Sequence, residues 1–96
     1  MRREEVLRVL SREKATISGF GVASLSVFGS VGRDEARAES DVDLLVEFVR
    51  PVGLFQFVRL RRFLEGLLGV RVDLVTPAAL KPQLREQILR EAIRAA

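Results

Sequence analysis

The stretch FGSVGRDEARAESDVDLLV, residues 28–46, decides how this chain folds. One expected strand ends where it begins, and a second strand fills its last residues. Between the two strands lie Gly29-Ser30 and a polar spacer. The second strand opens with Asp41 and Asp43, which share one side because alternate strand residues point to the same face. Folding alone does not require two carboxylates there, so the stretch predicts a chemical site as well as a strand.

Apolar periodicity on either side of this stretch predicts alternating helices and strands. Gly69 is expected to cap the central helix, and Thr76-Pro77 to open a short helical turn. This order indicates an α/β (α+β) fold, with a small mixed sheet of three or slightly more strands packed against helices, in a single domain over 1–96. The expected elements are helices over 2–14, 54–68 and 82–95, a short helix or loop over 33–38, and strands over 23–28, 42–48 and 70–75.

A third carboxylate, Asp73, occupies a position in the last expected strand where an apolar residue would be ordinary. Val72 and Leu74 lie on the opposite face from it. The helix between the second and third strands has about the right length to bring them side by side and parallel. Asp73 is therefore expected to join Asp41 and Asp43 on one face of the sheet.

Three neighbouring carboxylates repel one another unless a cation lies between them, and Mg²⁺ is the natural occupant. One or two such ions, held by shared aspartates, would suit phosphoryl or nucleotidyl transfer. Gly29 lets a phosphate approach the backbone, and Ser30 adds a hydroxyl donor. Arg33 suits phosphate oxygens, and Ser40 adjoins the first aspartate.

The composition restricts the chemistry. The chain has no cysteine and no histidine, which excludes disulfides, thiolate nucleophiles, typical zinc sites and Ser-His catalysis. The net charge of +3 indicates a polyanionic partner only weakly, and arginines 59, 61 and 62 fit a solvated helix face better than an RNA contact. No apolar run approaches the ~20 residues of a membrane span. With no signal-peptide pattern at its start, the chain is expected to be cytoplasmic.

These residues resemble a known family. One motif consists of Gly29-Ser30, a spacer of ten residues and Asp41-Val42-Asp43, with Arg33 inside the spacer and Ser40 at its end. This motif is similar to the signature of DNA polymerase beta-like nucleotidyltransferases. The segment RVDLVTPAALKPQLREQILREAI, residues 71–93, resembles the rest of the minimal nucleotidyltransferase branch. Members often have Ala-Arg-Gly where this chain has Gly32-Arg33-Asp34. The resemblance implies metal binding and catalysis at Asp41, Asp43 and Asp73, and nucleotide binding at Gly29, Ser30, Arg33 and Ser40.

The resemblance also implies a function. Minimal nucleotidyltransferases act as antitoxins of HEPN-domain ribonuclease toxins, some by Mg²⁺-dependent transfer of AMP from ATP to a toxin tyrosine. The sequence leaves two alternatives open: a non-catalytic antitoxin that neutralises its partner by binding, and a nucleic-acid-binding module. A homodimer through 54–68 or the last helix is equally compatible with the sequence.

Overall fold

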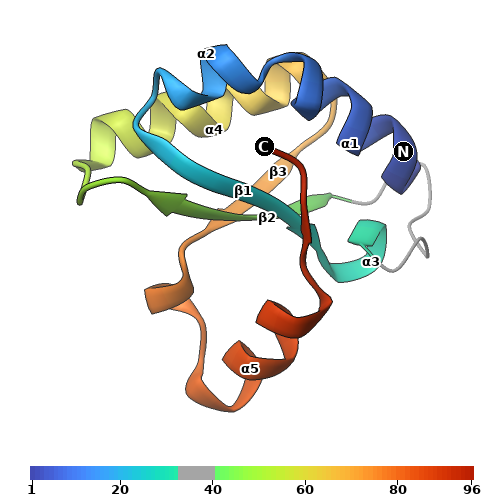
Figure 1. Ribbon diagram of the computed structural model, residues 1–96, viewed down its shortest axis with the longest axis vertical. Helices are drawn as coiled ribbons and strands as arrows, with labels where there is room; N and C mark the ends of the chain where they lie inside the picture. Colours follow the sequence, from blue (N-terminus) through green and yellow to red (C-terminus); the bar gives the residue numbers. More distant parts are fainter. Residues whose placement is uncertain (33–40) are drawn as a thin grey trace.

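The described strands form one mixed sheet (Figure 1). The computed structural model describes residues 1–32 and 41–96. The strand order is β3-β2-β1-β4, in which β2 is parallel to β3, and β1 is antiparallel to both β2 and β4. The elements are α1 (Arg3–Arg12), α2 (Lys14–Ser18), β1 (Val22–Phe28), α3 (Gly29–Gly32), β2 (Val42–Phe48), α4 (Leu54–Leu68), β3 (Val72–Val75), the 3-10 helix η1 (Pro77–Ala79), α5 (Pro82–Glu91) and β4 (Ile93–Arg94).

Helices α1, α2 and α4 cover one face of the sheet, whereas η1 and α5 lie on the other side (Figure 1). The hydrophobic core lies between the sheet and the first group of helices. Its fully buried members come from these helices, from strands β1 and β2 and from α3: Val6, Leu10, Ile17, Leu25, Val27, Val31, Val42, Leu44, Val46, Leu60 and Leu64. The predicted class, a small mixed sheet packed against helices, is confirmed.

Strand β2 has the two faces that its alternation predicts. Val42, Leu44 and Val46 are completely buried in the core. Asp43 is half-buried on the opposite face. Leu45 shares that second face and is buried there without belonging to the core cluster. Strand β2 can therefore secure the fold with one face and present polar groups on the other.

Helix α4 and the crossover it forms are as predicted. The helix spans Leu54–Leu68, and Gly69 ends it in the left-handed conformation at φ 69°. The Gly69 amide donates to the Glu65 carbonyl at 2.8 Å, which closes the last turn. The crossover places β3 parallel to β2, although β3 begins at Val72 rather than at residue 70.

The prediction of a last helix over 82–95 is wrong at its C-terminal end. Helix α5 ends at Glu91, and the chain continues as the edge strand β4. The Ala95 amide donates to the Leu25 carbonyl at 2.8 Å, and Ala96 joins the core. Backbone pairing with the open edge of β1 replaces the last helical turn, because α5 itself buries no side chain.

The first helix and the loop after β1 also differ from expectation. The helix predicted over 2–14 is divided at Glu13 into α1 and α2, and the second piece adds Ile17 to the core. The residues after Phe28 form the helical turn α3 rather than an open loop. The short helix expected over 33–38 lies outside the described residues. Within the described part of the chain, no helix has the length and hydrophobicity needed to cross a membrane.

Candidate active site

Asp43 and Asp73 are direct neighbours on adjacent strands. In the parallel ladder of β2 and β3, Val42 pairs with Val72 and Asp43 pairs with Asp73. Neighbouring strands lie about 4.8 Å apart, so the two carboxylates project side by side from the face opposite the core. Asp43 is half-buried and Asp73 is exposed. This juxtaposition is the one that the crossover length predicts.

Two hydrogen bonds fix the beginnings of these strands. The Val42 amide donates to the Arg71 carbonyl at 2.9 Å, which joins the start of β2 to the start of β3. The Val72 amide donates to Glu65 Oε2 at 3.0 Å, so a side chain of α4 satisfies a donor at the sheet edge. Glu65 thereby holds the backbone directly before Asp73. Glu65 was not identified from the sequence, where its position is that of a solvent-facing residue of an amphipathic helix.

Asp41 lies immediately before β2 and is exposed. It is two residues before Asp43 and outside the strand, which begins at Val42. Among the described residues, no group of three or more Asp and Glu side chains is close enough to hold a metal ion. The donor set nevertheless fits Mg²⁺, which takes one or two carboxylates, water and substrate phosphate oxygens rather than a closed protein cage.

Gly29 lies directly against the carboxylate of Asp43. Phe28 is the antiparallel partner of Asp43, and the chain turns after it with Gly29 at φ 69°. A β-carbon added at position 29 would lie 2.1 Å from Asp43 Oδ2 and 2.9 Å from its Cγ. Glycine is therefore required both by the left-handed backbone and by the aspartate, independently of the phosphate approach that the sequence predicted.

Helix α3 is held in place by Val31, which is 1% exposed and belongs to the core. This contact fixes the turn that carries Gly29 and Ser30 beside β2. Val31 was not identified from the sequence, where it is a lone apolar residue between Ser30 and Gly32. Arg33 and Ser40, the other expected nucleotide-binding residues, lie outside the described residues, as does Asp34.

Comparisons with known proteins identify the family of this chain. Residues 4–95 match the profile of the nucleotidyltransferase domain family. A solved minimal nucleotidyltransferase structure superimposes with a TM-score of 0.84 at 47% identity, covering 97% of this chain and 95% of that one. A Shewanella oneidensis MNT antitoxin complex with a tri-AMPylated HEPN toxin has a TM-score of 0.66 at 16% identity, covering 94% of this chain and 71% of the other, and shows the fold alone.

The chain belongs to the nucleotidyltransferase domain family, because the match covers nearly all of it. Within that family it is a homologue of the protein adenylyltransferase MntA of Thermococcus cleftensis. The two are 43% identical over 91 residues, which cover 94% of this chain and 92% of the relative. The expectation of a nucleotidyltransferase is thus confirmed.

Proposed function

We propose that this chain transfers AMP from ATP to a hydroxyl group, expected to be a tyrosine, of a HEPN-domain toxin in a Mg²⁺-dependent reaction, and so acts as its antitoxin. The observation that carries the proposal is the in-register pair Asp43 and Asp73 with Gly29 against Asp43. Two known proteins support the proposal. The Thermococcus cleftensis relative is named a protein adenylyltransferase, and the Shewanella oneidensis antitoxin is in complex with a tri-AMPylated HEPN toxin. Such a reaction is expected to take place in the cytoplasm, where ATP is available.

The three carboxylates are expected to have different roles because they occupy different positions. Asp41 and Asp43 would hold one or two Mg²⁺ ions, with Asp73 as a further ligand or as the base. Bound Mg²⁺ would neutralise charge on the phosphate oxygens. The acceptor oxygen forms a bond to the α-phosphorus, and the bond from that phosphorus to the pyrophosphate oxygen breaks. Asp73 is exposed beside Asp43, so it can accept the proton that the hydroxyl loses.

The nucleotide is expected to lie over α3. Gly29 lies against the Asp43 carboxylate, so a triphosphate bound over α3 would lie beside the carboxylates that hold the cation. Ser30 is the next residue of that turn. Arg33 and Ser40 complete the proposed nucleotide-binding set on the strength of the sequence pattern.

Incubation with labelled ATP, Mg²⁺ and a HEPN-domain protein from the same organism tests the proposal. The parent should label that protein, and the double substitution Asp41→Asn with Asp43→Asn should not. The variant is isosteric, so circular dichroism and its melting temperature should stay close to those of the parent. Equal labelling by a folded double variant would refute the mechanism. If the double variant fails to label but still neutralises the toxin, the alternative of a binding antitoxin is correct.

A further inference from the structure

An apolar surface lies at the turn between β2 and α4. Val49 is 68% exposed, Leu54 74% and Phe55 83%. We call residues 49–57, with Phe20 and Arg59 beside them, the β2–α4 surface. Single exposed apolar residues are ordinary, but a group of them within one turn is typical of an interaction site.

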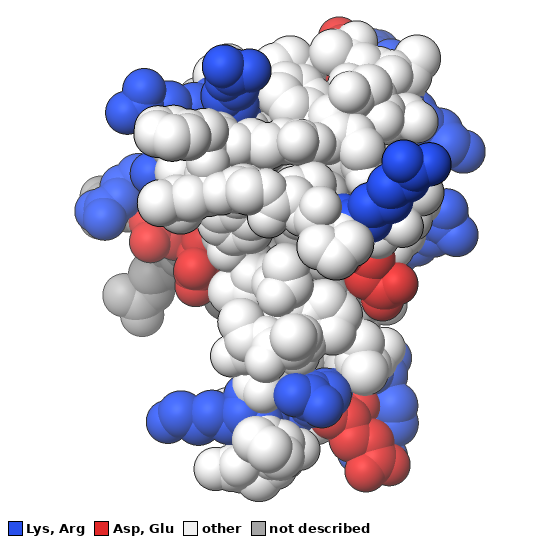
Figure 2. All heavy atoms as spheres, turned by 90° about the vertical axis from the view of Figure 1, so that its left-hand side faces the viewer, with Lys and Arg blue, Asp and Glu red and all other residues white. Residues whose placement is uncertain are grey.

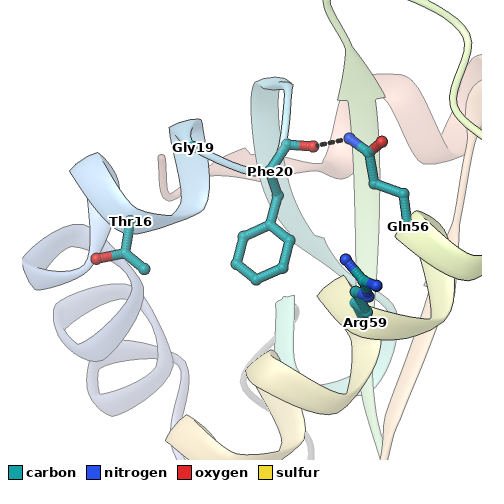
Figure 3. Close-up of a pocket in the computed structure, with 5 residues that line it drawn as sticks. All are labelled: Thr16, Gly19, Phe20, Gln56 and Arg59. Carbon is teal, nitrogen blue, oxygen red and sulfur yellow. Dashed lines mark hydrogen bonds between the residues drawn. The ribbon is translucent and has the colours of Figure 1, made fainter.

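Three hollows adjoin one another across the β2–α4 surface. The first has a volume of about 580 Å³ and is lined by Thr16, Gly19, Phe20, Gln56 and Arg59 (Figure 3). The second, of about 400 Å³, shares Gln56 with the first. The third, of about 450 Å³, shares Pro51 and Val52 with the second and extends to Thr76 and Ala78. A surface with adjoining hollows can accept several side chains of one partner, as interface cores do.

The first hollow is fixed by contacts within the chain. The Phe20 ring projects into the space between α2 and α4, and its carbonyl accepts a hydrogen bond from Gln56 Nε2 (Figure 3). On its other side the ring packs against Phe63, with 5.1 Å between centroids. Gly21, at φ 85°, leaves room for the Gln56 amide. Because these side chains are already ordered in the free protein, binding of a partner would cost little side-chain entropy.

The charge of this surface is one-sided. Arg50 and Arg59 are exposed, and of the described residues that line the three hollows none is acidic. Figure 2 shows an uncharged central area on this side of the molecule, with Lys and Arg side chains bordering its upper part and Asp and Glu side chains at its left and right edges below them. A second copy of the chain would bring these arginines against one another. The surface therefore suits a different protein, one with apolar side chains bordered by carboxylates.

We propose that the β2–α4 surface is the anchoring site for the acceptor protein, the HEPN-domain partner, an inference that rests on the proposed function. The surface lies at the C-terminal end of β2, whereas Asp41 and Asp43 lie at its N-terminal end (Figure 1). The seven residues of β2 separate the two by roughly 20 Å. The partner is therefore held at one end of the sheet while its acceptor hydroxyl enters at the other, and anchoring and transfer are separable by mutation.

Affinity for a HEPN-domain protein from the same organism, measured by calorimetry, tests the anchoring site. Phe55 is the most exposed large apolar side chain of the described residues, at 83%, and Phe55→Asp should weaken binding by about 30-fold or more, the loss expected for an aromatic hot spot. Leu89→Asp, at an apolar α5 residue that is 44% exposed, is the matched control and should bind like the parent. Arg50→Glu combined with Arg59→Glu should slow association most at low salt. Unchanged melting temperatures verify that the variants fold.

The outcomes separate the anchoring site from the proposed function. Parent-like binding by Phe55→Asp would overturn the anchoring site and leave the transferase proposal standing. Loss of binding in Phe55→Asp, together with a parent that binds but transfers no AMP, would refute the transferase alone. Sedimentation of the chain by itself should show a monomer. A dimer that Phe55→Asp dissociates would show that a second copy occupies the surface, and would also overturn the proposal.

Discussion

Gly29 and Asp43 share one space: a β-carbon on the first would lie 2.1 Å from Oδ2 of the second. The two residues come from different elements, since Gly29 begins α3 and Asp43 belongs to β2. Their contact joins the turn expected to hold phosphate to a carboxylate expected to hold the cation. The Gly29 backbone contacts the Asp43 side chain directly. This contact therefore sets the distance between the expected phosphate site and the expected cation site.

Gly29→Ala should damage both stability and transfer. The left-handed backbone alone costs an alanine about 1–2 kcal/mol, and the added methyl must displace the Asp43 carboxylate. We expect the melting temperature to fall and labelling of the acceptor to fall much further. Gly66→Ala is the control, because Gly66 is inside α4 with open space at its β-carbon. It should stabilise the protein by roughly 1 kcal/mol, and equal effects of the two substitutions would refute the steric argument.

A double-mutant cycle should show that positions 29 and 43 are coupled. Asp43→Ala removes the carboxylate that the new methyl would meet. Gly29→Ala should therefore cost less in the Asp43→Ala background than in the parent, by about 0.5–3 kcal/mol, the range for residues in contact. Urea unfolding of the four proteins measures this difference. Additive costs would mean that only the backbone conformation requires glycine.

Asp73→Asn should lower the rate of transfer without weakening nucleotide binding greatly. The amide keeps the shape of the side chain but cannot accept a proton, and a positioned general base typically contributes about 100- to 10,000-fold. We expect kcat to fall by at least about 100-fold while KM for ATP changes little. Single-turnover labelling at several ATP concentrations separates the two constants. A decrease smaller than about threefold would exclude Asp73 as the base.

The sequence was sufficient for the centre of the fold, because local patterns determine it. Alternation in β2 and the length of the α4 crossover together placed Asp43 beside Asp73. Gly69 marked the end of α4 correctly, since a left-handed cap has few alternatives to glycine. The predicted roles of Arg33 and Ser40 stay predictions.

The remaining features depend on contacts between distant parts of the chain. Residues 93–94 continue a helical pattern, yet they pair with β1 because that edge would otherwise be open. Val31 looks isolated in sequence, and only its burial against the core makes α3 a fixed turn. Periodicity in one segment carries no information about which distant edge or hollow that segment will fill.

Glu65→Ala should destabilise the edge of the sheet and disturb the site. The substitution leaves the Val72 amide without the acceptor that it now has at 3.0 Å, at a cost of about 1–3 kcal/mol. Because Val72 precedes Asp73, transfer should also slow. Glu65→Gln keeps an oxygen acceptor and should behave nearly like the parent in urea unfolding and labelling. If both variants match the parent, the hydrogen bond has no positioning role.

Val31→Ala should loosen α3 and thereby impair nucleotide use. The side chain is 1% exposed, and removing buried methyl groups from a core leaves a cavity, with a cost of roughly 1–3 kcal/mol. A misplaced α3 would shift Gly29 from Asp43, so KM for ATP should rise more than expected from the loss of stability. Leu84→Ala, at a residue 47% exposed on α5, is the control and should change unfolding by less than about 0.5 kcal/mol. Assays well below the melting temperatures of the parent and of Val31→Ala separate the change in KM from the loss of stability. An unchanged KM in a destabilised Val31→Ala protein would show that Val31 supports only the core.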